Sequence, residues 1–190
     1  MALANLRLRE TLKNQSIRDA LTGLFNRRCT DETFVREIHR AAREKSDVSL
    51  VSIDVDFFKK FNDVHGHQAG GRVLSQLGVL LRGSTRGADV ASRMGGEELA
   101  ILMPVACAVD AVARAEESRR AAESLAIIHD GRSIGPVTLS IGVASFRHHG
   151  AAVEDIMRAA EAALYRAKRA GRNRRRRRGS KRRLNGSEYL

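Results

Sequence analysis

The run Arg93-Met94-Gly95-Gly96-Glu97-Glu98-Leu99 places two adjacent glycines and two carboxylates between two short apolar segments, 89–94 and 99–103. Two adjacent glycines supply the positive φ angles that a tight turn between strands requires. The run therefore predicts a β-hairpin. Because glycine has no side chain, another group can approach the backbone at the tip, and the two acids beside it make the tip a candidate seat for a metal ion and a phosphate. The alternative is an ordinary hairpin with solvated acids.

Helical and strand patterns alternate on both sides of this hairpin. Helices are expected over 2–18, 31–45, 72–82, 108–125 and 151–170. Buried strands are expected over 48–54 and 137–145. The alternation predicts an α/β domain, with a central mixed sheet flanked by helices. The segment 2–18 precedes every strand, which is typical of a connecting or coiled-coil stalk.

Asp54 and Asp56 stand at the end of the expected strand 48–54. In an extended chain, residues two apart point to the same side, so both carboxylates would face one way. Acids at the carboxyl end of a central strand are frequent metal ligands, but they also serve as simple caps of the next segment. The sequence leaves both roles open.

The segment 65–71 is rich in glycine and precedes the expected helix 72–82. A glycine loop that opens a helix can present backbone N–H groups to a phosphate. His65 and His67 are candidate ligands, although a surface pair of histidines is more often an ordinary solvated pair.

The net charge of +12 is concentrated at one end of the chain. From Arg172 onward there are nine Lys and Arg residues and one acid, Glu188. Such a block of like charge predicts a disordered tail over 174–190, able to contact nucleic acid or an anionic membrane weakly. The chain has no apolar run of membrane-spanning length, and its start is too quickly charged for a signal peptide. With only Cys29 and Cys107, neither a disulfide framework nor a zinc site is expected, so the expected location is the cytoplasm.

Six ordered motifs carry a resemblance to a known family. They are the runs at 19–28, 54–63, 66–70, 93–98, 138–144 and 163–173. Together they resemble the GGDEF family, the diguanylate cyclase domains of bacterial signalling. The resemblance implies a fold related to adenylyl cyclase and polymerase palm domains. It also implies a reaction that joins two GTP into cyclic di-GMP with release of pyrophosphate. It divides the chain into a stalk helix over 1–18, a GGDEF domain over 19–173 and a basic tail over 174–190.

The same resemblance assigns roles to individual residues. Asp54 and Glu97, with the carbonyl of Val55, would hold Mg²⁺ or Mn²⁺. Glu97 stands at the proton-acceptor position, and Lys59 would stabilise the charged transition state. The residues at substrate-binding positions are Asn62 and His67 for the nucleoside, Gly95, Gly96 and Glu98 at the hairpin, and Lys168 and Arg172 for the distal phosphates.

The family also implies an assembly and a regulatory site. Each active site holds one GTP, so a homodimer joined through the N-terminal helix would be the active species, under the control of an upstream sensor domain. Arg86 and Asp89 match the RxxD inhibitory site at which cyclic di-GMP binds. A second inhibitory arginine often lies in a run that here reads 115–119, where Glu117 weakens the match.

Three positions depart from the family pattern. Gly71 replaces the aspartate that recognises guanine, which threatens affinity and base selectivity. Leu99 replaces a phenylalanine, with a modest packing effect expected, and Glu161 replaces an aspartate with its charge kept. Two alternatives to a guanine-specific cyclase therefore remain open: a cyclase with relaxed base choice, and a module without turnover that acts as a receptor for GTP or cyclic di-GMP.

Overall fold

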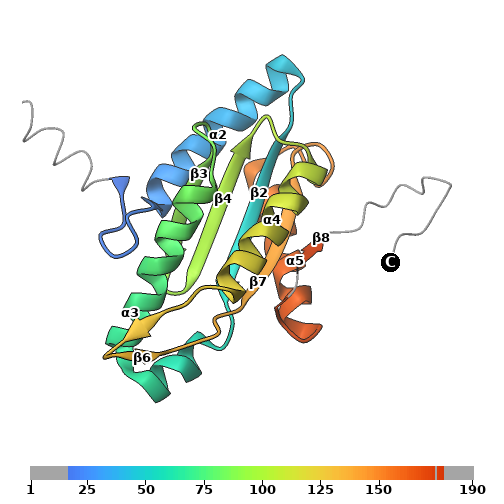
Figure 1. The fold of residues 1–190 in the computed structure, drawn as a ribbon. Coiled ribbons are helices and arrows are strands. Elements are labelled where there is room, and N and C mark those ends of the chain that lie inside the picture. The colour runs from blue at the N-terminus through green and yellow to red at the C-terminus, as the bar shows by residue number, and fades with distance from the viewer. Residues whose placement is uncertain (1–16, 174, 178–190) are drawn as a thin grey trace, which may run out of the picture.

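The computed structural model describes residues 17–173 and 175–177, so the predicted stalk lies almost wholly outside the described residues. A six-stranded mixed sheet in the order β1-β3-β4-β2-β7-β8 forms the centre (Figure 1). Its strands are β1 (Phe25–Asn26), β2 (Val48–Val55), β3 (Val90–Gly95), β4 (Glu98–Pro104), β7 (Leu139–Ser145) and β8 (Arg175–Arg177). The small hairpin of β5 (Ile128–His129) and β6 (Arg132–Ser133) stands apart from it. The expectation of a mixed sheet flanked by helices is confirmed.

The helices cover both faces of the sheet. They are α2 (Arg27–Glu44), α3 (Phe58–Ser84), α4 (Ala108–Glu123) and α5 (Val153–Arg169). One core cluster joins α3 and α4 to the odd-numbered residues of β2, and the other joins α2 and α5 to the even-numbered ones. Figure 1 shows α4 in front of the sheet and α5 behind it. Because β2 and β7 are buried on both faces, their apolar runs are nearly continuous.

The prediction of a glycine loop over 65–71 is wrong. The structure places this segment inside α3, which continues on both sides of a kink where Gly66 has a φ of 83°. A side chain on Gly70 would overlap the side chain of Asn62, so this glycine permits close packing within a helix instead of breaking one. The helix therefore begins at Phe58, fourteen residues before the predicted start at Arg72.

Other boundaries differ less. The second helix begins at Arg27 and not at Asp31, because the side chain of Asn26 caps it by accepting a hydrogen bond from the Cys29 amide at 3.0 Å. Within the tail predicted to be disordered, residues 175–177 form β8, parallel to β7. No helix in the described residues is both long and apolar enough to cross a lipid bilayer.

Candidate active site

The carboxyl end of β2 brings Asp54 to the last turn of α5. The residue is only 6% exposed, and its Oδ2 lies 2.7 Å from the Nζ of Lys168. Burial raises the pKa of the Asp54 carboxyl; the hydrogen bond and charge of Lys168 oppose this, and the charges of Glu97 and Glu98 raise the pKa further. The structure thus brings together Asp54, Glu97, Glu98 and Lys168, which the family resemblance assigns to one site, and the repulsion among the three carboxylates creates a demand for positive charge.

The tip of the β3–β4 hairpin lies directly beside Asp54. Asp54 pairs with Glu98 in the antiparallel register of β2 and β4, and the Val55 amide donates to the Glu97 carbonyl at 3.4 Å. Gly95 and Gly96 have φ angles of 153° and 49°, and a Cβ at either would meet nothing within 4 Å. The predicted hairpin is confirmed, and its backbone is open to an approaching group.

Arg93 ties this tip to the rest of the domain. Its Nε and Nη2 donate to the Gly96 carbonyl at 3.0 and 2.9 Å, and its Nη1 lies 3.1 Å from Oδ2 of Asp19. Partial burial alone would raise the pKa of the Asp19 carboxyl, but hydrogen bonds from Thr22 and the charge of Arg93 hold it below its usual value. Asp19 is thus a charged anchor for the hairpin.

The predicted metal ligands Asp54, Glu97 and the Val55 carbonyl are all oxygen donors at one end of the sheet. Oxygen ligands suit Mg²⁺ or Mn²⁺. Glu97 and Glu98 both raise the pKa of buried Asp54, and a divalent cation would offset this crowding of negative charge. In the described part of the chain no three His, Cys, Asp or Glu side chains gather in a metal-binding arrangement. The residues present fit a site that takes its remaining ligands from main-chain carbonyl groups, water or substrate.

Asp56 stabilises the fold by accepting hydrogen bonds from three other residues. It is 8% exposed, and its Oδ1 accepts from the Ser140 hydroxyl at 2.7 Å. Its Oδ2 accepts from the Thr138 hydroxyl at 2.8 Å and from the Asn173 amide at 2.9 Å. These three bonds occupy both carboxylate oxygens, so of the two roles left open by the sequence the structure favours the structural one.

The first half of α3 carries Lys59 and Asn62. Lys59 is exposed in the first turn, after Phe57, which has a φ of 57°. The Oδ1 of Asn62 is buried, and no hydrogen bond to it is found among the described residues. An unpaired buried amide oxygen is costly and is typical of a group that awaits a ligand or a water molecule.

A cavity of about 830 Å³ lies between α3 and the β5–β6 hairpin. Its lining includes His67, Gly71, Leu21 and Asp130. His67 and Gly71 therefore line one cavity, whereas Asn62, the other residue expected to contact the nucleoside, is not among its lining residues. A Cβ on Gly71 would meet only the Cδ1 of Leu21, at 3.7 Å, so this position has room for a larger side chain.

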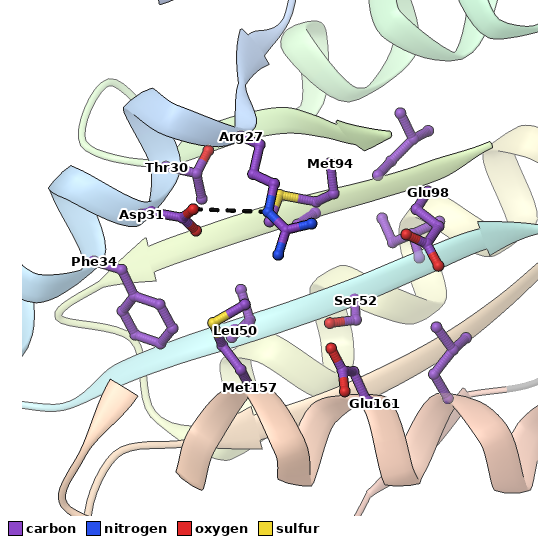
Figure 2. Close-up of a pocket in the computed structure, with 14 residues that line it drawn as sticks. Arg27, Thr30, Asp31, Phe34, Leu50, Ser52, Met94, Glu98, Met157 and Glu161 are labelled. Atoms are coloured by element: carbon purple, nitrogen blue, oxygen red, sulfur yellow. Dashed lines mark ion pairs between the residues drawn. The ribbon is translucent and has the colours of Figure 1, made fainter. Parts of the chain in front are cut away.

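A second cavity, of about 70 Å³, lies between α2, α5 and the sheet (Figure 2). Figure 2 shows the Arg27 side chain extending over it, and the Nε of Arg27 lies 3.7 Å from Oδ2 of Asp31. Glu98 and Glu161 border the same space. Glu98 thus borders this cavity and is also the register partner of Asp54. Glu161, which departs from the family pattern, borders the same cavity from α5.

The two cations predicted to bind distal phosphates lie at the end of α5. Lys168 is in the last turn, and Arg172 follows the helix with a φ of 62°. The guanidinium carbon of Arg172 lies 4.3 Å from the centre of the Phe57 ring, a cation–π contact across the mouth of the site. Lys168 thus contacts Asp54 at the end of β2, and Arg172 contacts Phe57 just before α3.

The segment Arg86–Asp89 forms a closed turn between α3 and β3. The Arg86 amide donates to Oδ2 of Asp89 at 2.9 Å, and the Asp89 amide donates to the Arg86 carbonyl at 2.9 Å. Arg86 is exposed at this turn. By contrast, Arg119 is 14% exposed and forms ion pairs with Glu116 and Glu123, so the candidate second inhibitory arginine is committed to partners inside the domain.

Two groups of site residues were not predicted from the sequence. One is the Arg93–Asp19 pair, and the other is Asn173, which bonds to both Asp56 and α4. Gly171, Arg172 and Asn173 all have positive φ angles. Gly171 and Asn173 flank Arg172 after the end of α5, and glycine and asparagine near a helix end are a sequence signal for such a turn, because both residue types tolerate left-handed backbone.

The comparisons with known proteins agree with this geometry. The family described as "Diguanylate cyclase, GGDEF domain" matches residues 16–174. The chain is 40% identical to Diguanylate cyclase A of Treponema denticola over 72% of its own length and 37% of that protein. It is 37% identical to the response regulator PleD of Caulobacter vibrioides over 83% of its length and 35% of that protein. The chain thus spans about a third of the length of these curated relatives.

Solved structures give the same result. The coiled coil and GGDEF domain of DgcB from Caulobacter crescentus, in complex with c-di-GMP, superimposes with a TM-score of 0.85 at 29% identity. The match covers 93% of this chain and 94% of that one. The active GGEEF domain of a diguanylate cyclase from Vibrio cholerae gives a TM-score of 0.75 at 34% identity, over 81% of this chain and 97% of that one. The chain belongs to the GGDEF family of diguanylate cyclases.

Proposed function

We propose that this chain is an active diguanylate cyclase, which condenses two GTP into cyclic di-GMP and releases pyrophosphate. The observation that carries the proposal is the cluster of Asp54, Glu97, Glu98 and Lys168 beside the open backbone of Gly95 and Gly96. Nucleotidyl transfer needs carboxylates to hold a metal ion, a carboxylate near the attacking hydroxyl, and cations for the leaving group. The carboxylates and the lysine at this end of the sheet support the proposal, because they are of the types that these roles need.

In the proposed reaction, Asp54, Glu97 and the Val55 carbonyl would hold Mg²⁺ or Mn²⁺, which would neutralise part of the charge of the triphosphate. Glu97 accepts the proton of the ribose 3′-hydroxyl as that oxygen attacks the α-phosphate of the second GTP. Lys59 stabilises the charge of the transition state. Lys168 and Arg172 bind the distal phosphates and so stabilise the pyrophosphate that leaves.

The reaction requires two nucleotides, so we propose that two copies of the domain face each other, joined through the N-terminal helix. A solved relative contains a coiled coil beside its GGDEF domain, and another, SiaD from Pseudomonas aeruginosa, was crystallised with its activator SiaC. Arg86 and Asp89 are proposed to bind the product and restrain the enzyme. Their closed turn supports this role, because it leaves Arg86 exposed.

The test is incubation of the purified chain with GTP and Mg²⁺, with products separated by chromatography and identified by mass spectrometry. Cyclic di-GMP is expected from the wild type and not from Glu97→Ala. The matched control is Glu154→Ala, which removes an exposed carboxylate from the start of α5 and leaves the product unchanged. A wild-type chain that folds, dimerises and yields no cyclic dinucleotide would contradict the proposal.

A second candidate function is a receptor that binds cyclic di-GMP without turnover. The absence of a side chain at Gly71 favours the receptor function, since this position offers no group to bind the guanine base of GTP. In that case the chain yields no product, still binds cyclic di-GMP, and loses this binding in Arg86→Ala. The same incubation with a mixture of GTP and ATP distinguishes a base-selective cyclase from one that also forms a mixed product.

A further inference from the structure

We propose that Asn173 is a positioning residue of the nucleotide site, which holds Lys168 and Arg172 in place by joining the end of α5 to Asp56 on one side and to α4 on the other. This inference rests on the proposed function, because it concerns the cations assigned to the distal phosphates. Asn173 follows Arg172 directly and lies five residues beyond Lys168.

The first step is the unusual backbone at the end of α5. Gly171, Arg172 and Asn173 have φ angles of 109°, 62° and 49°. A left-handed conformation in a residue other than glycine costs on the order of 1 kcal/mol or more, so such turns persist only where neighbouring contacts hold them. Arg172 contributes two such contacts, because its amide donates to the Ala167 carbonyl at 3.2 Å and its guanidinium lies over Phe57. Asn173 adds further contacts on either side of the turn.

The main chain of Asn173 supplies one such contact. Its amide donates to Oδ2 of Asp56 at 2.9 Å, and Asp56 is fixed in turn by the hydroxyls of Thr138 and Ser140. Asp56 precedes Phe57, whose ring lies under the guanidinium of Arg172. The turn at the end of α5 and the turn between β2 and α3 are thus bonded to each other at two adjacent points.

The side chain of Asn173 supplies the other contacts. Its Oδ1 accepts from Nη1 of Arg119 at 2.6 Å, and its Nδ2 donates to Oε1 of Glu123 at 3.0 Å. Arg119 is itself held by both oxygens of Glu116 at 2.9 and 3.1 Å. Hydrogen bonds from Arg119 lower the pKa of Glu116 to about 2, so this network stays charged throughout the neutral range. The side-chain amide therefore joins the exit of α5 to the opposite face of the sheet, where α4 lies.

These contacts have a consequence for the phosphate-binding cations. Lys168 reaches Asp54 from the last turn of α5, and Arg172 reaches Phe57 from the turn that follows. If the side chain of Asn173 is lost, the turn keeps its amide bond to Asp56 but loses its link to α4. The cations would then sample more positions, and binding of the triphosphate would weaken, since a displacement of about 1 Å can lower efficiency by up to roughly a hundredfold.

The test compares steady-state kinetics of the full chain with GTP and Mg²⁺. Asn173→Gly is the informative variant, because glycine adopts left-handed backbone freely and keeps the amide that bonds to Asp56, so only the side-chain link is removed. We expect its KM for GTP to rise on the order of tenfold, with kcat within about threefold of the wild type. Arg119→Ala should give the same KM change, and the double variant should add little, since both remove one link.

Two further variants serve as controls. Arg120→Ala removes a neighbouring arginine that bonds to the same Glu116 but is 74% exposed and does not touch Asn173, so its KM should match the wild type. Glu123→Gln keeps an oxygen that can accept from the amide of Asn173, so its KM should stay close to the wild type. Hydrogen exchange of the amide at position 173 reports on the turn directly, and its protection should fall in Asn173→Gly.

The outcomes separate the two proposals. An unchanged KM in Asn173→Gly, or a lower melting temperature with KM unchanged, would overturn the positioning role and leave the cyclase function intact. If the wild type turns over too slowly for kinetics, the affinity for GTP and Mg²⁺ measured by calorimetry replaces KM, with the same expectation. A wild-type chain that binds no GTP would overturn the proposed function and this inference with it.

Discussion

Restoring a carboxylate at position 71 is predicted to increase the preference for guanine. Gly71 lies in the helical part of α3 after the kink, and a Cβ there meets only the Cδ1 of Leu21, at 3.7 Å. Gly71→Asp should therefore fold without strain, and helix propensity makes aspartate slightly better than glycine within a helix. The new side chain would extend into the cavity of about 830 Å³ that His67 also lines.

The size of the effect follows from this environment. A carboxylate that accepts the N1 and N2 protons of guanine makes charge-assisted hydrogen bonds, each worth roughly 1.5 to 3 kcal/mol when water is excluded. A cavity this large admits water, which offsets about half of even the smallest such gain, so we expect about 1.5 kcal/mol in total. This corresponds to roughly a tenfold gain in kcat/KM for GTP relative to ATP.

The assay measures kcat/KM for GTP and for ATP, together with the share of mixed product from an equimolar mixture. Gly71→Asn is the matched control, because asparagine has nearly the same volume but no charge and only one acceptor oxygen. The reasoning fails if Gly71→Asn gains as much as Gly71→Asp, which would make filled volume the cause. It also fails if Gly71→Asp improves ATP as much as GTP, because adenine offers no proton at N1.

Three other predictions concern the fold that supports the site. Gly142→Ala should lower the free energy of unfolding by about 3 kcal/mol in urea titrations, because its Cβ would overlap the backbone of α5, whereas Gly83→Ala, whose Cβ meets nothing within 4 Å, should not be destabilising. Glu116→Gln should destabilise the chain at pH 6. Because the pKa of Glu116 is lowered to about 2 by Arg119, this difference from the wild type should shrink as the pH falls from about 4.5 towards 2, and a constant difference would contradict the assignment. Asp19→Ala should release the hairpin tip and lower kcat/KM about tenfold with a smaller change in melting temperature, and unchanged kinetics would show that the anchor is dispensable.

The sequence predicted the central strands well, because β2, β4 and β7 are apolar runs between clear turns and Gly95-Gly96 marks one hairpin. It failed at α3, where glycines needed for close packing resemble a loop. It also missed the shortest strands, since two or three residues such as those of β5 carry no periodic pattern. Tertiary pairing decides such segments, and periodicity does not report it.

Family motifs indicated which residues belong to the candidate site, but not which hydrogen bonds join them. Asp54, Glu97 and Lys168 were assigned to one site through family motifs, and the structure brings them together. The roles of Asp56 and Asn173 could not be predicted, because the bond between them joins residues 117 positions apart. A local pattern cannot indicate which distant carboxylate will accept the proton of a main-chain amide.

The ion pair between Lys168 and Asp54 makes the protein's own ammonium group a competitor of other cations at the proposed nucleotide site. Lys168 cannot neutralise Asp54 and bind a polyphosphate at full strength at the same time. A polyphosphate that attracts Lys168 leaves the buried carboxylate short of positive charge, and so increases its affinity for another cation. By thermodynamic reciprocity, a cation bound at Asp54 frees Lys168 and increases the affinity for the polyphosphate by the same factor. Nucleotide and divalent ion should therefore bind cooperatively, and each should bind more weakly alone than in the presence of the other.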